Sequence, residues 1–121
     1  MLTLPPAVRV FVHLGPTDMR RSFDGLAGIV REIIQADPLS GHLFVFFNRR
    51  RDRVKILFWD RTGLCLWYKR LEEGVFAMPE VTGADTPASV EMNWADLSLI
   101  LEGIDLAGAK RHKRFQMRRS A

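Results

Sequence analysis

The apolar positions in the first third of the chain change from a strand-like to a helix-like period. Residues 9–14 alternate and are partly β-branched, which predicts a strand that ends at a Gly-Pro pair. The apolar residues that follow recur every three or four positions, as on one face of a helix. They are Met19, Phe23, Leu26, Val30, Ile33 and Ile34. We therefore expect one long helix, capped by Thr17 or Asp18 and stopped before Pro38.

Two glycines lie inside this predicted helix. Gly25 and Gly28 should each weaken it by about 1 kcal/mol relative to alanine. Their presence indicates either close packing against a sheet or a helix that begins nearer Ser22. The pattern alone leaves both interpretations open.

The middle of the chain predicts three consecutive strands. Residues 43–47 are a continuous apolar run, typical of a strand buried on both faces. Residues 54–59 and 64–71 are the next two strands, joined by turns at 48–53 and 60–63. Aspartate at the start of the second turn and glycine at its end favour a type I turn with a glycine bulge. Such a turn pairs Trp59 with Cys65, Leu57 with Trp67, and Lys55 with Lys69.

The last third of the chain predicts a loop and a short helix. Residues 72–87 contain two glycines and two prolines and are expected to form mostly loop, with 75–78 as a candidate edge strand. Asn93 can cap a last helix through its side-chain oxygen, and Gly103 fits the position just after the end of that helix.

These elements together predict an α+β fold. We expect an antiparallel β-meander of about four to five strands, packed with one long N-terminal helix and one short C-terminal helix against a face. A chain of 121 residues is the length of one domain and can fold without a disulfide or a metal. Residues 1–106 are assigned to this domain, and residues 107–121 to a basic, disordered tail.

Composition and charge limit the cellular environment and the class of partner that the sequence predicts. Cys65 is the single cysteine, which rules out an internal disulfide and fits a reducing, cytoplasmic environment. No apolar run approaches a membrane span, and the N-terminus lacks the features of a signal peptide, so no membrane contact is expected. The net charge of +4 is uneven, because residues 109–121 hold six cations and no acid. Such a tail favours a polyanion partner, or else is only solubilising.

The turn at 48–53 carries the densest charge of the chain. Arg49, Arg50, Arg51 and Arg53 occupy four of five positions, offset only by Asp52. Arginine suits phosphate because its planar fork bonds two oxygens at once, so this turn predicts contact with DNA. The alternative is a sheet edge protected from aggregation by charge.

The predicted strand pairing extends this hypothesis to one face of the sheet. It places Trp59 and Trp67 on the same face as two facing lysines. The repulsion between the lysines favours a nearby anion, and the indoles of the tryptophans could stack on bases. The alternative is that the tryptophans are core residues and the lysines reach solvent or an acid. The full set of candidate DNA-binding residues is Arg20, Arg21, Arg49, Arg50, Arg51, Arg53, Lys55, Lys69, Arg70, Lys110, Arg111, Lys113 and Arg114.

Signatures of an enzyme are absent from the sequence. Three scattered histidines and one cysteine predict no zinc site, and no glycine-rich phosphate loop occurs. We therefore expect no catalytic residues, no metal and no cofactor. A metal-dependent nuclease site assembled from distant carboxylates stays open as an alternative, since the chain has 14 of them.

A series of short motifs resembles one known family. In order, they include Thr17-Asp-Met-Arg20, Asp24-Gly-Leu26, Asn48-Arg-Arg50, Asp52-Arg-Val-Lys-Ile-Leu57, Gly63-Leu-Cys-Leu66, Tyr68-Lys-Arg-Leu71 and Leu101-Glu-Gly-Ile-Asp105. As a set, running from about Arg9 to Asp105, they resemble the accessory protein encoded by the second open reading frame of insertion-sequence-66 transposons. Two positions depart from the pattern: the family usually has arginine in place of Phe47 and glycine in place of Arg51.

The resemblance implies a small bacterial protein that assists a separately encoded transposase, which itself cuts and joins DNA. Another small transposon-encoded protein usually accompanies the two. No catalytic residues carry over from the family. The first hypothesis is therefore a non-catalytic accessory factor that contacts transposon-end DNA and the transposase, in the cytoplasm and at the nucleoid. The alternatives are a protein adaptor without DNA contact and a metal-dependent nuclease.

Overall fold

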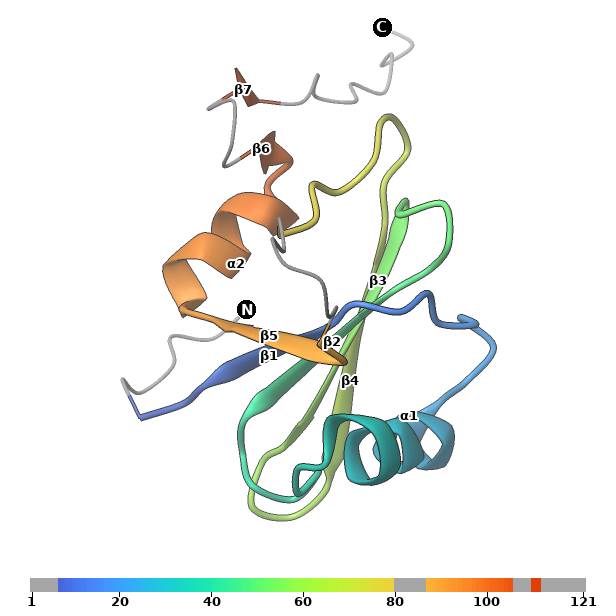
Figure 1. Ribbon diagram of the computed structural model, residues 1–121, viewed down its shortest axis with the longest axis vertical. Helices are drawn as coiled ribbons and strands as arrows, with labels where there is room; N and C mark the ends of the chain where they lie inside the picture. Colours follow the sequence, from blue (N-terminus) through green and yellow to red (C-terminus); the bar gives the residue numbers. More distant parts are fainter. Residues whose placement is uncertain (1–6, 80–86, 106–109, 112–121) are drawn as a thin grey trace, which may run out of the picture.

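Five strands form one mixed sheet in the part of the chain that the computed structural model describes, which is residues 7–79, 87–105 and 110–111 (Figure 1). The strands are β1 (Val10–His13), β2 (Leu43–Phe47), β3 (Arg53–Trp59), β4 (Leu64–Arg70) and β5 (Ser89–Met92). Their order across the sheet is β4-β3-β2-β1-β5. Helix α1 (Phe23–Ile29) continues into a π-helical turn η1 (Val30–Ile34), and α2 (Trp94–Leu101) follows β5. A small ribbon pairs β6 (Ile104–Asp105) with β7 (Lys110–Arg111).

The predicted antiparallel meander is wrong at the first strand. β1 pairs parallel with β2, with Phe11 opposite Phe44, and the chain between them returns through α1. A parallel pair needs such a long crossover, which the helix supplies. On its other side β1 pairs antiparallel with β5, with Phe11 opposite Glu91. The sequence pattern did not predict β5, because it has four residues and none of them is buried.

The two helices lie on opposite faces of the sheet and not together on one (Figure 1). Phe44 and Phe46 of β2 pack with Leu26 and Val30 in one core, on the α1 side. The alternate residues of β2 pack with Leu97 and Ile100 of α2 in the other core; they are Leu43, Val45 and Phe47. All five residues of β2 are buried, which confirms the prediction of a strand covered on both faces.

The N-terminal helix is shorter than predicted. α1 begins at Phe23, with Ser22 at its N-cap, so the interpretation of a start near Ser22 is the correct one. Asp18 forms a local turn instead of a cap, accepting from the Arg20 backbone N–H at 2.9 Å. The ammonium of Lys55 bonds the carbonyls of Met19 and Arg21, at 2.6 and 2.8 Å, which holds this segment outside the helix.

The end of the first helix also differs from a simple 3.6-residue pattern. At η1 the helix widens, and the N–H of Gln35 bonds the carbonyl of Val30. Widening rotates the following side chains around the axis, so Ile33 lies 49% exposed although the apolar stripe predicted it inside. Phe23 is likewise 43% exposed at the first position of α1.

The pairing of β3 with β4 is shifted by one residue from the predicted register. Trp59 lies opposite Leu64, Ile56 opposite Trp67, and Lys55 opposite Tyr68. The left-handed residue of the connecting loop is Arg61, with φ of 76°, so Gly63 does not form the expected bulge. Because a shift of one residue exchanges the faces, Lys55 and Lys69 do not face each other.

The last helix confirms its prediction. Asn93 Oδ1 accepts from the Asp96 backbone N–H at 2.8 Å, and Gly103 has φ of 82° just beyond the helix. The candidate edge strand at 75–78 is wrong: these residues are in no strand, and Phe76 is buried in the α2-side core.

Parts of the C-terminal prediction lie outside the described residues. Lys110 and Arg111 form β7, whereas Lys113 and Arg114 fall beyond the described chain. The division into a domain of residues 1–106 and a tail stays a prediction. In the described ranges, no helix has the length and apolar character needed to cross a membrane.

Candidate nucleic-acid interface

The loop between β2 and β3 is an ordered, internally bonded turn. We name residues 48–53 the arginine turn. The side-chain oxygen of Asn48 accepts from the backbone N–H groups of Asp52 and Arg53, at 3.1 and 3.0 Å. Its amide nitrogen donates to Asp52 Oδ1 at 2.6 Å. This last bond is the main reason why the pKa of Asp52 lies below its usual value. A single asparagine therefore organises the backbone that presents the arginines.

Three backbone bonds also fix the arginine turn and the residue before it to two neighbouring segments. Thr17 N–H donates to the Phe47 carbonyl at 2.8 Å, directly before the turn. Leu71 N–H donates to the Asp52 carbonyl, and Phe76 N–H to the Arg51 carbonyl, each at 2.7 Å. The turn is thus held between the β1–α1 loop and the chain that follows β4.

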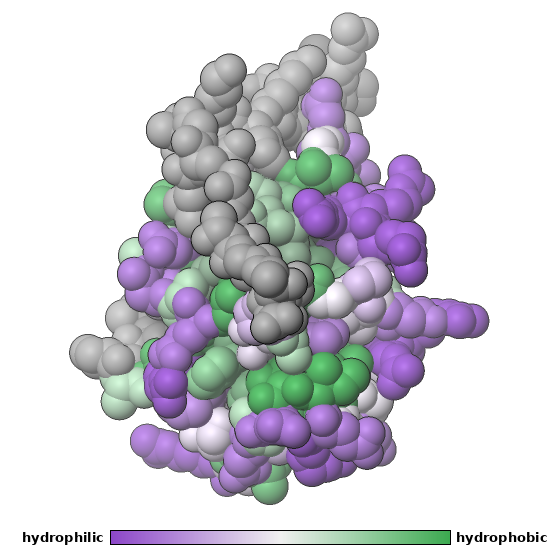
Figure 2. All heavy atoms as spheres, in the orientation of Figure 1, coloured by the Kyte–Doolittle hydropathy of each residue, from purple (hydrophilic) through white to green (hydrophobic). Residues whose placement is uncertain are grey.

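Three guanidiniums of the turn make no ion pair within the described part of the chain. Arg49, Arg50 and Arg51 are exposed, and none of them makes an ion pair with another described residue. Arg53 is half-buried and donates to the Tyr68 hydroxyl at 3.3 Å. With Asp52 as its only acid, the turn carries a local net charge of three positive units. Figure 2 shows hydrophilic residues gathered on the side of the molecule where the β2–β3 loop lies in Figure 1.

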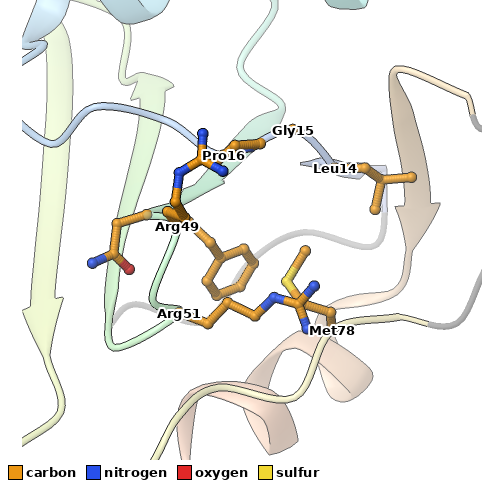
Figure 3. Close-up of a pocket in the computed structure, with 8 residues that line it drawn as sticks. Leu14, Gly15, Pro16, Arg49, Arg51 and Met78 are labelled. Carbon is orange, nitrogen blue, oxygen red and sulfur yellow. The ribbon is translucent and has the colours of Figure 1, made fainter.

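Two of these arginines border a pocket of about 190 Å³. Figure 3 shows Arg49 extending toward Pro16 and Arg51 toward Met78, with the pocket between them. On its other side, Arg49 also lines a shallower depression with Arg50 and Thr17. The turn therefore presents its cations around concave surfaces where an anionic group could be bound from two sides.

Two of the four lysines of the predicted set, Lys55 and Lys69, are engaged in the fold. Lys55 is 6% exposed, and its ammonium is bonded to the two carbonyls that precede α1. Lys69 donates to the Leu101 carbonyl at 2.9 Å, at the C-terminal end of α2. A cation at that end of a helix is stabilising because the carbonyls there have no partner in the helix. Lys55 thus bonds the segment before α1, and Lys69 bonds the end of α2, each on its own face of the sheet.

The arginines outside the turn differ in their partners. Arg20 pairs with Asp18 at 2.6 Å, and this bond lowers the pKa of Asp18 to about 2. Arg70 pairs with Glu72 at 2.9 Å, while Arg21 is exposed with no ion pair in the described chain. Both ion pairs are on the surface, where solvent screens them and they contribute little to stability.

The predicted base-stacking pair is not brought together. Trp59 and Trp67 lie on opposite faces of the sheet, since Ile56 is the partner of Trp67 and Leu64 that of Trp59. Trp67 packs against the α2-side core and is half-buried. The residue that sequence reasoning missed is Tyr68, which is 47% exposed. Tyr68 lies beside the ends of β3 and β4 that carry Arg53 and Arg70, and only the correct register shows this.

Clusters suited to a metal ion are absent from the residues that the structure describes: no three His, Cys, Asp or Glu side chains come close enough together. The candidate interface consists of cations, one aromatic ring and ordered backbone. Its chemistry is that of binding an anion.

A comparison with known families identifies the chain. The family model described as "IS66 Orf2 like protein" matches residues 8–111. The chain belongs to this IS66 Orf2-like family. It is therefore a transposon-associated accessory protein, as the sequence motifs indicated.

Two relatives of this IS66 Orf2-like protein come from Sinorhizobium fredii. The "Uncharacterized protein y4hO" is 40% identical over 105 residues, which cover 87% of this chain and 88% of the relative. The "Uncharacterized protein y4jC" is 36% identical over 104 residues, 86% of each chain. No solved structure gives a significant match.

The departures of this IS66 Orf2-like protein from the family pattern have distinct places in the fold. Phe47 is 1% exposed and packs on Phe76, with ring centroids 5.6 Å apart, so the departure there is in the core. Arg51 has φ of 59°, a left-handed conformation that glycine adopts without strain. The position that the family usually fills with glycine is thus one where this chain holds an arginine under backbone strain.

Arg51→Gly is expected to stabilise the IS66 Orf2-like protein by about 1 kcal/mol. The left-handed conformation costs a non-glycine residue about 1–2 kcal/mol, of which the greater freedom of glycine in the unfolded chain cancels a part. Urea denaturation measures the difference. Arg50→Gly is the matched control, because Arg50 has no positive φ and the change should be neutral or destabilising there. Equal stability changes in the two variants would contradict the strain at Arg51.

Proposed function

We propose that the protein assists transposition by contacting transposon DNA through the arginine turn while it associates with the transposase of the same element. The observation that carries the proposal is the set of three exposed arginines that make no ion pair with a described residue, Arg49, Arg50 and Arg51. Family membership supports the setting, and the turn supplies a chemistry that suits it. Terminal DNA, the transposase and a further small transposon-encoded protein are the proposed partners.

Rigidity of the turn supports binding over mere surface charge. Loops that protect a sheet edge need only charge, whereas this turn holds its backbone with the Asn48 bonds and three further bonds to neighbouring segments. Because the backbone that carries these arginines is already ordered, binding phosphate requires ordering of their side chains alone. The proposal is confined to the turn and its neighbours Arg20, Arg21 and Arg70. Lys55 and Lys69 are left out of it, because their ammonium groups already bond carbonyls.

Charge reversal in the turn tests the proposal. Arg49→Glu combined with Arg50→Glu is expected to weaken binding of duplex DNA from the transposon end by tenfold or more at moderate salt. Each phosphate contact contributes about −0.9 to the slope of log affinity against log salt concentration, so the double alanine variant should reduce the magnitude of that slope by about two. Fluorescence anisotropy over a salt series measures both quantities.

The matched control is Arg31→Glu combined with Arg61→Glu. These arginines are also exposed and make no ion pair with a described residue, and the change in net charge is the same. Arg31 lies on η1, and Arg61 lies in the loop at the opposite end of β3 from the arginine turn. Equal losses in the two double variants would reduce the effect to net charge and overturn a specific interface.

Docking on the transposase without DNA contact is the second candidate. Exposure of Phe23 and Ile33, at 43% and 49%, favours it, because both are large apolar residues on the α1–η1 helix. Co-purification with the transposase after nuclease treatment separates the candidates. A complex that survives digestion, and that the double variant Phe23→Ser with Ile33→Ser no longer forms, supports the adaptor. A complex that dissociates on digestion supports bridging by DNA. The nuclease alternative is tested by incubation of labelled DNA with magnesium or manganese.

A further inference from the structure

Tyr68 occupies an exposed position next to a facing pair of arginines at one end of β4. On this face of the sheet, Arg53 lies directly opposite Arg70, and the next pair on the same face is Lys55 with Tyr68. Like charges that face each other across two strands repel. The sequence predicted facing cations beside aromatic rings for two lysines and two tryptophans. The structure has such an arrangement at Arg53, Arg70 and Tyr68 instead.

The tyrosine ring is fixed on one side and at its hydroxyl. The Lys55 ammonium lies over the ring, 4.8 Å from its centroid, and is itself held by two backbone carbonyls. Arg53 donates to the Tyr68 hydroxyl at 3.3 Å. Since 47% of Tyr68 is nevertheless exposed, the residue keeps surface that is open to a ligand. A ring immobilised before binding loses little entropy when a flat ligand stacks on it.

An open recess surrounds this ring. It is lined by Arg53, Tyr68, Arg70 and Glu72, with a volume of about 460 Å³. Glu72 pairs with Arg70 at 2.9 Å, but the two side chains are 46% and 58% exposed. An ion pair so exposed is weakened by solvent screening, so a phosphate can replace the carboxylate at little cost.

We propose that Tyr68 is a stacking platform for an unpaired base of single-stranded DNA, with Arg53 and Arg70 binding the phosphates on either side of that base. Aromatic faces beside cationic groups are the usual means of holding single strands. Bases inside a duplex already have both faces covered, so only an unpaired base can use this ring. The inference rests on the proposed function and extends it, because Arg53 also belongs to the arginine turn. The two surfaces are continuous and suit a junction of duplex and single strand.

Affinity for labelled oligonucleotides tests the platform. Three probes are used with the full chain: an oligothymidine, its RNA counterpart and a blunt duplex. Tyr68→Ala is expected to weaken oligothymidine binding about tenfold, since one base stacked on an aromatic side chain contributes about 1–3 kcal/mol. Tyr68→Leu should lose as much, whereas Tyr68→Phe retains the ring and should retain most of the affinity. Leu39→Ala is the control at a 51% exposed apolar residue outside the recess.

The outcomes separate this inference from the proposed function. Oligothymidine affinity that is unchanged in Tyr68→Ala, or lost equally in Tyr68→Phe, overturns the platform. Tighter binding of RNA with the same dependence on Tyr68 overturns the assignment to DNA. If duplex binding requires Arg49 and Arg50 while single-strand binding does not depend on Tyr68, the platform is overturned and the proposed function stands. Absence of binding to every probe overturns both proposals. Thermal melting of each variant confirms that a loss does not come from unfolding.

Discussion

Replacing Lys55 by methionine is expected to lower the free energy of unfolding by about 3 kcal/mol. Lys55 is 6% exposed, and its ammonium bonds the carbonyls of Met19 and Arg21, at 2.6 and 2.8 Å. A hydrogen bond to a charged group contributes about 1.5–3 kcal/mol, and methionine would leave both carbonyls without their partner. The apolar methionine side chain recovers a part of this loss because it fills most of the same space and needs no desolvation of a charge. The β1–α1 loop should therefore loosen together with the loss of stability.

Urea denaturation measures the effect, with Lys69→Met as the matched control. Lys69 makes one such bond, to the Leu101 carbonyl, and its side chain is less buried. Its replacement should cost about 1–2 kcal/mol. If Lys55→Met were as stable as the parent protein, or less affected than Lys69→Met, Lys55 would not be the structural cation described above.

Asn48→Ala is expected to destabilise the protein by about 2–3 kcal/mol and to weaken DNA binding as well. The side chain of Asn48 makes three bonds within the arginine turn, two of them to backbone N–H groups. Each neutral bond contributes about 1 kcal/mol, and the half-buried donors left behind add to the cost. A turn without these bonds presents its arginines in many conformations, and ordering them again opposes binding.

Two further asparagine variants make this test specific. Asn93→Ala removes one cap bond at α2, to the Asp96 N–H, and should cost about 1 kcal/mol with no effect on DNA affinity. Asn48→Asp keeps the acceptor for the two N–H groups but places a second carboxylate beside Asp52, which should raise the pKa of both acids. DNA affinity that falls equally in Asn48→Ala and Asn93→Ala would contradict a specific role of the turn.

Strands with strong local signals were predictable from the sequence, and their partners were not. The apolar run of β2 and the cap of α2 at Asn93 are encoded by adjacent residues. The parallel pairing of β1 with β2 depends on contacts over more than thirty positions, for which a window of sequence holds no signal. The start of the first helix was misplaced for the same reason, since Lys55 competes from a distant strand for the carbonyls before Phe23.

The candidate interface was predictable where it depends on composition and not where it depends on register. Four arginines in one short turn indicate a cationic loop whatever its pairing, and the structure shows three of them exposed. The face of each residue in β4 follows instead from the loop conformation at Arg61, which has a positive φ. The predicted register was shifted by one residue, so it placed Tyr68 on the wrong side of the sheet relative to β3. The exposed ring beside Arg53 and Arg70 was therefore overlooked.

The position of β1 between β2 and β5 governs when the fold can be completed during translation. Phe11 has one neighbour at Phe44 and the other at Glu91, so the earliest strand to be synthesised acquires its second neighbour last. Until β5 leaves the ribosome, β1 is an open edge, and such edges promote aggregation of nascent chains. Fragments that stop before Ser89 would retain that edge and lack α2, the cover of one core. Mapping of partner contacts by deletion would therefore report misfolding, and point variants are the appropriate tool.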